Sequence, residues 1–228
     1  MPRAYPRSMT ILHNLIRNPL HAAIAGALTL VVPATLAIPT APAAAQADQL
    51  DQAVTALRSI TTLRADFTQT DRNGQVLRGV LTLKSPGRIR FEYERSANML
   101  VVSNGRSLTL IDYEVAQIQR WPIGNSPLGA LLDPKRDVKR YGRLQPTSNP
   151  NVISIEVKDP KKPEYGTIAL VFVRNAAAPG GLELASWVAL DAQNKRTTVR
   201  LSNHRYGIAV PDSTFTYRDP TRRTGGRP

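Results

Sequence analysis

The stretch from Gly79 to Tyr93 limits the possible folds more than any other part of the chain. Its apolar residues recur at every second position in two arms, which are separated by Ser85-Pro86-Gly87, a sequence typical of a tight turn. Alternation with a period of two gives a strand one apolar face and one polar face. The stretch is therefore predicted to form a β-hairpin, whose apolar face must be covered by the protein's own core or in part by a ligand. The residues of that face are Leu81, Leu83, Ile89, Phe91 and Tyr93.

Much of the remaining chain shows the same period of two. Asn73-Gly74 and Asn104-Gly105 are strong signals for two-residue hairpin turns between such segments. The segments expected to be strands are 63–69, 76–84, 88–93, 99–103, 106–112, 115–121, 153–157, 168–172, 182–190, 196–202 and 214–217. So many short strands in succession predict a mainly β protein of the α+β class, with a strongly curved antiparallel sheet that forms an incomplete barrel.

Two helices are predicted. Apolar residues at helical spacing indicate an amphipathic helix over Gln49–Ser59, with its apolar side on the sheet. A second, very short helix follows Ser126, a good N-cap, and Pro127, which suits the first helical position. Its apolar residues are Leu128, Leu131 and Leu132. A helix this short must dock through its leucines and should open easily, either as a movable lid or as a plain plug of the core. The polar, basic stretch 135–150 is expected to be surface structure.

The N-terminal part has the composition of a signal peptide. Three arginines precede an uncharged apolar run from Leu20 to Ile38, and Ala45-Gln46-Ala47 fits a signal-peptidase site. The expected division is a cleaved signal peptide at 1–47, one domain at 48–217 and a disordered basic tail at 218–228. The alternative for the apolar run is a transmembrane anchor. Pro33 and the Ala/Pro-rich segment after it favour cleavage.

The chain offers little reactive chemistry. It has no cysteine, and His204 is the one histidine after residue 47, so no thiolate or two-histidine metal site and no thiol nucleophile is expected. Glu92 and Glu94 share a strand face, but a catalytic pair is disfavoured by the basic residues around them. The formal net charge of +13, or +10 without the three leader arginines, favours anionic partners, and export argues against nucleic acid. These features indicate binding rather than catalysis, with no cofactor and no catalytic or metal-ligating residue.

Several motifs in order resemble the LolA family of periplasmic lipoprotein carriers, over essentially all of residues 49–217. They are Phe67-Thr68-Gln69, Pro86-Gly87-Arg88-Ile89-Arg90-Phe91-Glu92-Tyr93, Val102-Ser103-Asn104-Gly105, Ile111-Asp112-Tyr113, Gln117, Asn125-Ser126-Pro127-Leu128 and Pro211-Asp212-Ser213 with Phe215. The resemblance implies an incomplete β-barrel with helices over its mouth, enclosing an apolar cavity for acyl chains. It also implies a periplasmic monomer that receives acylated lipoproteins from an ATP-driven inner-membrane exporter. It would pass them to an outer-membrane receptor or to the membrane itself.

On this interpretation the predicted site has three parts. The cavity residues are Phe67, Leu81, Leu83, Ile89, Phe91, Tyr93, Leu100 and Trp121, and the lid residues are Leu128, Leu131 and Leu132. Family members commonly have an Arg-Pro step whose arginine ties the barrel to the lid. Here the step is Ser85-Pro86, so Lys84 and Arg88 are the candidates for that tie.

Other classes remain open. One alternative function is a lipid- or lipoprotein-sensing module in envelope stress signalling, which uses a related open barrel. An esterase or glycosidase is disfavoured because the sequence shows no arrangement of catalytic residues that fits either enzyme. A purely structural β-domain is a further alternative.

Overall fold

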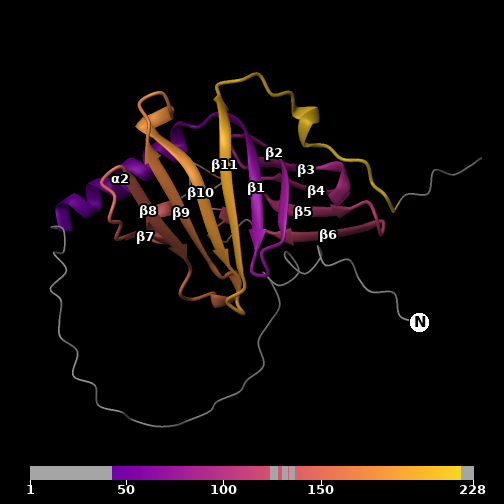
Figure 1. Cartoon of the computed structure of the whole chain (residues 1–228), viewed down its shortest axis with the longest axis horizontal. Coiled ribbons are helices and arrows are strands. Elements are labelled where there is room, and N and C mark those ends of the chain that lie inside the picture. The colour runs from indigo at the N-terminus through magenta and orange to yellow at the C-terminus, as the bar shows by residue number, and fades with distance from the viewer. Residues whose placement is uncertain (1–42, 124–127, 130–132, 134–136, 222–228) are drawn as a thin grey trace, which may run out of the picture.

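A single antiparallel sheet of eleven strands dominates the protein (Figure 1). The computed structural model describes residues 43–123, 128–129, 133 and 137–221. The strands follow the order β6-β5-β4-β3-β2-β1-β11-β10-β9-β8-β7, so two sequential meanders are joined where the first strand pairs with the last. The mainly β, open antiparallel architecture predicted from the sequence is confirmed. Within the described residues, β6 and β7 are the two edges of the sheet and do not pair with each other.

The strands match the predicted hairpins closely. Their bounds are β1 Thr62–Asp71, β2 Val76–Lys84, β3 Arg88–Tyr93, β4 Met99–Asn104, β5 Ser107–Asp112, β6 Gln117–Pro122, β7 Gly142–Gln145, β8 Val152–Lys158, β9 Thr167–Arg174, β10 Leu182–Leu190 and β11 Arg196–Tyr206. The helices are α2 Ala43–Ser59 and the 3₁₀ turns η2 Arg95–Ala97, η3 Val138–Arg140, η4 Pro163–Tyr165, η5 Pro179–Gly181 and η6 Asp212–Phe215. None of the helices that the structure describes is long and apolar enough to cross a membrane.

Alternation of side chains gives the sheet an apolar inner face. In β1, residues Leu63, Ala65 and Phe67 are buried while Arg64 and Asp66 between them are exposed. Because β2 pairs with β1 and β3 in register, the apolar positions of all three strands lie on the same side. The inner face is covered in two regions. One cluster centres on β1–β5 and β11, and the other lies where α2 packs on β7, β8 and β10.

A close approach of strands explains Gly79. It lies opposite Phe67 on β1 and Tyr93 on β3. A Cβ atom at this position would overlap the carbonyl oxygen of Glu92 and lie 2.8 Å from the Phe67 ring. Glycine is therefore required here by the space between the strands.

The outer face carries a third apolar cluster, which the chain covers with its own C-terminal segment, defined here as residues 208–217. Leu100, Val102 and Ile111 are buried there, with Phe215 and Tyr217 packed against them. Arg90 fastens this segment by donating from Nη1 to the carbonyl oxygens of Thr214 at 3.2 Å and Thr216 at 3.0 Å. Arg90 lies on β3 and points away from the inner face, as do the cluster residues of β4 and β5.

Three local predictions were wrong. The first helix begins at Ala43, not Gln49, so a cut after Ala47 would fall inside it. The stretch 214–217 is not a strand, because η6 docks on the outer face through side chains and Arg90 rather than through a ladder. The stretch 135–150 is not all surface structure. It contains the edge strand β7 and the fully buried Val138.

Candidate functional site

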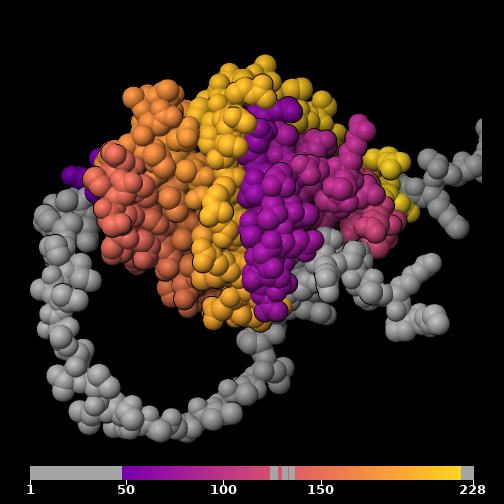
Figure 2. Space-filling view, viewed as in Figure 1, coloured from indigo at the N-terminus to yellow at the C-terminus, as the bar shows by residue number. Residues whose placement is uncertain are grey.

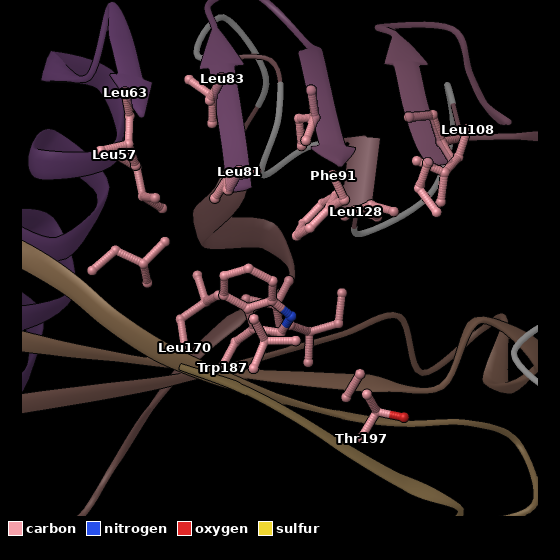
Figure 3. Close-up of a pocket in the computed structure, with 18 of the residues that line it drawn as sticks. Leu57, Leu63, Leu81, Leu83, Phe91, Leu108, Leu128, Leu170, Trp187 and Thr197 are labelled. Carbon is pink, nitrogen blue, oxygen red and sulfur yellow. The ribbon is translucent and has the colours of Figure 1, made fainter. Parts of the chain in front are cut away.

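A cavity of about 270 Å³ lies between the two halves of the curved sheet (Figure 3). Leucines and aromatic residues of β1–β5 face Leu170, Trp187 and Thr197 of β9–β11 across it. Leu57 of α2 closes one end, and Leu128 lies beside Phe91. The lining is apolar apart from a few side chains such as Arg58, Gln69, Ser85 and Thr197. Such a space favours an apolar ligand.

A chain of aromatic rings connects the two walls. Phe67 makes edge-to-face contacts with Phe91 and Tyr93, with ring centroids 5.3 Å and 5.1 Å apart. Phe91 then meets Trp187 at 5.9 Å and an interplanar angle of 74°. Edge-to-face pairs at these separations stabilise by roughly 0.5–1.5 kcal/mol each beyond their area burial. The Phe91–Trp187 contact joins β3 to β10, which are far apart in the sheet order.

Tyr93 and Gln69 form a hydrogen-bonded polar pair at the inner face. The Tyr93 hydroxyl donates to Gln69 Oε1 at 2.9 Å, and burial raises the pKa of this tyrosine far above its usual value. Both groups are therefore neutral partners inside an apolar wall. Among the described residues no group of three His, Cys, Asp or Glu side chains could hold a metal ion.

The structure brings together most of the predicted cavity residues. Those that line the cavity are Leu81, Leu83, Ile89, Phe91, Tyr93 and Trp121. Phe67 lies behind them in the core, where its ring supports Phe91 and Tyr93.

Leu100 does not belong to the cavity, and its prediction was wrong. It pairs with Glu92, which points outward, whereas its neighbour Val101 pairs with Phe91 and lines the cavity. β4 is buried on both faces, so its sequence has no alternation that could distinguish them.

The predicted lid falls mostly outside the described residues. Leu128 is half-buried and lines the cavity, and the Gly129 carbonyl oxygen accepts a bond from the Asp133 amide at 3.1 Å. Leu131 and Leu132 are among the residues that the structure does not describe.

Lys84 and Arg88, the candidates for a tie to the lid, point to the outer face and bind Asp212. Lys84 Nζ lies 2.6 Å from Asp212 Oδ1 and 2.8 Å from the Val210 carbonyl oxygen, and Arg88 reaches the same Asp212 oxygen. The Lys84 hydrogen bond and the two positive charges hold the pKa of Asp212 below its usual range. Both side chains therefore hold the C-terminal segment on the sheet, while Ser85 itself lines the cavity.

Most of the cavity lining was absent from the sequence prediction. Leu170, Leu184 and Trp187 of β9 and β10, together with Val138 and Leu57, all line the cavity. Leu184 and Trp187 lie in the predicted strand 182–190, but their odd spacing would put them on opposite faces, and only the register shift between Leu184 and Ser186 turns both to the cavity. The pairing of β1 with β11 then brings the second meander to face the first. No local sequence pattern predicts the pairing of β1 with β11.

His204 has a structural environment. Its Nε2 lies 2.9 Å from the Leu184 carbonyl oxygen, its Nδ1 lies 3.7 Å from Glu183 Oε2, and its ring stacks on Tyr206. Burial and then the nearby Glu183 charge raise the pKa of Tyr206 to about 12. No nucleophile adjoins the imidazole in these contacts.

Comparison with known proteins gives one consistent family. The family model described as outer membrane lipoprotein carrier protein LolA matches residues 58–218. The chain is 27% identical to an outer-membrane lipoprotein carrier protein of Chromobacterium violaceum, over 78% of this chain and 87% of that one. It is 28% identical to a protein of the same name from Xanthomonas oryzae pv. oryzae, over 83% of this chain and 92% of that one.

Solved structures with a similar fold are more distant. A LolA superfamily protein from Nitrosomonas europaea aligns with a TM-score of 0.43 and 10% identity, over 75% of this chain and 97% of that one. At this level the likeness concerns the fold alone.

Proposed function

The chain belongs to the LolA family of outer membrane lipoprotein carrier proteins, and from this premise we propose that its cavity binds the acyl chains of lipoproteins. In this role the protein carries lipoproteins from the inner to the outer membrane. The apolar cavity between the two halves of the sheet is the observation that carries the proposal.

The energetics of acyl chains call for such a cavity. A chain of about 16 carbons gains roughly 12 kcal/mol on leaving water, at about 0.8 kcal/mol per methylene. A lipoprotein with several such chains cannot cross an aqueous space alone. Walls of leucine and aromatic side chains supply the apolar surface that would replace water around these chains.

Cargo entry in this proposal requires the cavity to enlarge. Its volume of about 270 Å³ is just below the roughly 300–1,000 Å³ that pockets for drug-sized ligands occupy. Leu128 lies in the cavity beside Phe91, and we propose that acyl chains displace it. Because binding must then exchange one set of apolar contacts for another, the net affinity falls and release becomes possible. Leu131 and Leu132 are proposed to act with Leu128.

The proposed partners follow from this role. They are acylated lipoproteins, an inner-membrane exporter that supplies them, and an outer-membrane receptor or the membrane itself. The proposed working form is a monomer in the periplasm, after removal of residues 1–47 as a signal peptide.

Depletion followed by membrane fractionation tests the proposal. Loss of a carrier leaves lipoproteins at the inner membrane within a few generations. A sensing module in envelope stress signalling would instead change transcription first and leave lipoprotein distribution intact. That second outcome would overturn the carrier proposal.

A further inference from the structure

The outer face of β11, β1 and β2 carries an unusual concentration of arginine. Five exposed arginines occupy outward positions on these three adjacent strands. We call them the arginine face: Arg64, Arg78, Arg196, Arg200 and Arg205. β11 and β1 run down the middle of the surface seen in Figure 2, with no other described element over them.

Strand register places these side chains in rows across the sheet. Arg200 and Arg78 both lie opposite Thr68, one on each side of it. Since neighbouring strands are about 4.8 Å apart, these two arginines stand about 10 Å from each other. Arg205 lies directly opposite Arg64 on the neighbouring strand. Like charges in directly opposed positions destabilise a sheet, and an anion bound across them would remove that cost.

The positive charge of the face is not neutralised by the protein. None of the five arginines makes an ion pair or side-chain hydrogen bond with any residue that the structure describes. The single carboxylate at an outward position among them is Asp66, and its Oδ2 accepts a bond from Asn203 Nδ2 at 2.7 Å. This contrasts with Lys84 and Arg88 nearby, which bind Asp212. The face therefore presents a net positive field to a partner.

The composition of the face identifies the kind of partner. We propose that the arginine face binds the phosphate groups of an anionic phospholipid membrane. All five cations are arginines, whose planar forks bind phosphate oxygens in pairs. The residues between them are small and polar, including Thr68, Thr198 and Ser202. A specific protein interface would need an apolar centre with large anchoring side chains. The exposed apolar residue on this face is Val76 at the start of β2, outside the rows of arginines, so such a centre is missing.

This surface is distinct from the cavity, because the arginines alternate with the inward-pointing residues of the same strands. A membrane bound to the face therefore leaves the cavity lining untouched. For a carrier, such contact would hold the protein at a membrane between encounters. The inference does not depend on the carrier role, since vesicle binding through this face needs no acyl chain in the cavity.

Vesicle co-sedimentation of the proposed working form, residues 48–228, tests the proposal. Wild-type protein should bind anionic vesicles of phosphatidylethanolamine with phosphatidylglycerol. It should not bind uncharged vesicles of phosphatidylcholine. Each arginine near an anionic surface contributes roughly five-fold in affinity, so the triple variant Arg64→Gln, Arg78→Gln, Arg200→Gln should bind about 100-fold more weakly. Binding should also fall steeply with salt, since the Debye length shrinks from about 10 Å at 0.1 M to about 3 Å at 1 M.

A matched control removes the same charge elsewhere. Arg95, Arg140 and Lys161 are exposed residues outside the sheet strands, and their triple change to Gln lowers the net charge equally. Retained binding by this control supports the assigned face, and an equal loss would overturn it in favour of a general charge effect. Failure of wild-type protein to bind anionic vesicles would also overturn it. If only lipoprotein transfer fails in the arginine triple variant, the face serves an acidic protein partner and the membrane assignment is wrong.

The carrier proposal can fail independently. A variant with a disrupted cavity, such as Leu83→Asp, should keep vesicle binding in full. Loss of acyl-chain binding in that variant with unchanged vesicle binding would show the two surfaces to be separate.

Discussion

Replacement of Leu83 by aspartate separates ligand binding from folding. Leu83 lies on β2, lines the cavity and is half-buried, whereas its neighbour Leu81 is 3% exposed. A carboxylate at position 83 would keep access to water in the ligand-free protein, so the fold should persist. An acyl chain entering the cavity would have to strip that water from the carboxylate.

The size of the effect follows from the cost of placing aspartate in hydrocarbon. That cost is about 2.5–3.5 kcal/mol at the centre of a membrane helix. At 1.4 kcal/mol per factor of ten, acyl-chain binding should weaken by about 60- to 300-fold. The intermediate variant Leu83→Asn, which carries no charge, should lose less affinity than Leu83→Asp.

Displacement of a fluorescent fatty acid measures the affinity, and circular dichroism checks the fold. Val76→Asp is the matched control, because Val76 lies on the same strand, faces outward and is 41% exposed. This control should bind as the wild type does. If folded Leu83→Asp binds within two-fold of wild type, acyl chains do not occupy this cavity.

Three further predictions concern stability and its pH dependence. Gly79→Ala should lower the free energy of unfolding by more than about 2 kcal/mol, seen as a lower denaturant midpoint, because its Cβ would overlap the Glu92 carbonyl. Asp212→Asn should increase hydrogen exchange in the C-terminal segment, which loses its bond to Lys84. Since the pKa of Asp212 is lowered, its contribution is complete above the usual value of about 3.9 and is lost as the pH falls through the lower folded value. Tyr206 has its pKa raised to about 12, so stability should fall as the pH rises from about 10 towards that value, and Tyr206→Phe should reduce this slope.

Local patterns in the sequence predicted most of the sheet. Alternation and the Asn-Gly turns placed the strands from β1 to β6 to within a few residues, because hairpin pairing is set by neighbouring residues in the chain. The inner face of β3 followed directly from its apolar alternation. β4 lacks such a pattern, so the choice between Leu100 and Val101 needed the register with Phe91.

Long-range contacts could not be predicted in the same way. The pairing of β1 with β11 joins the two ends of the domain and brings Trp187 against Phe91. Likewise, Lys84 and Arg88 were predicted to tie the barrel to the lid, but both bind Asp212, a carboxylate more than a hundred residues away in the sequence. The sequence contains each of these residues but no signal of their contact.

Native mass spectrometry of the protein purified from its own cell envelope tests the central claim most directly. The account predicts a fraction of wild-type protein with an acylated polypeptide or lipid bound, and loss of that mass in Leu83→Asp. Wild-type protein found only at its unliganded mass, under conditions where acylated proteins are being made and exported, would contradict the account.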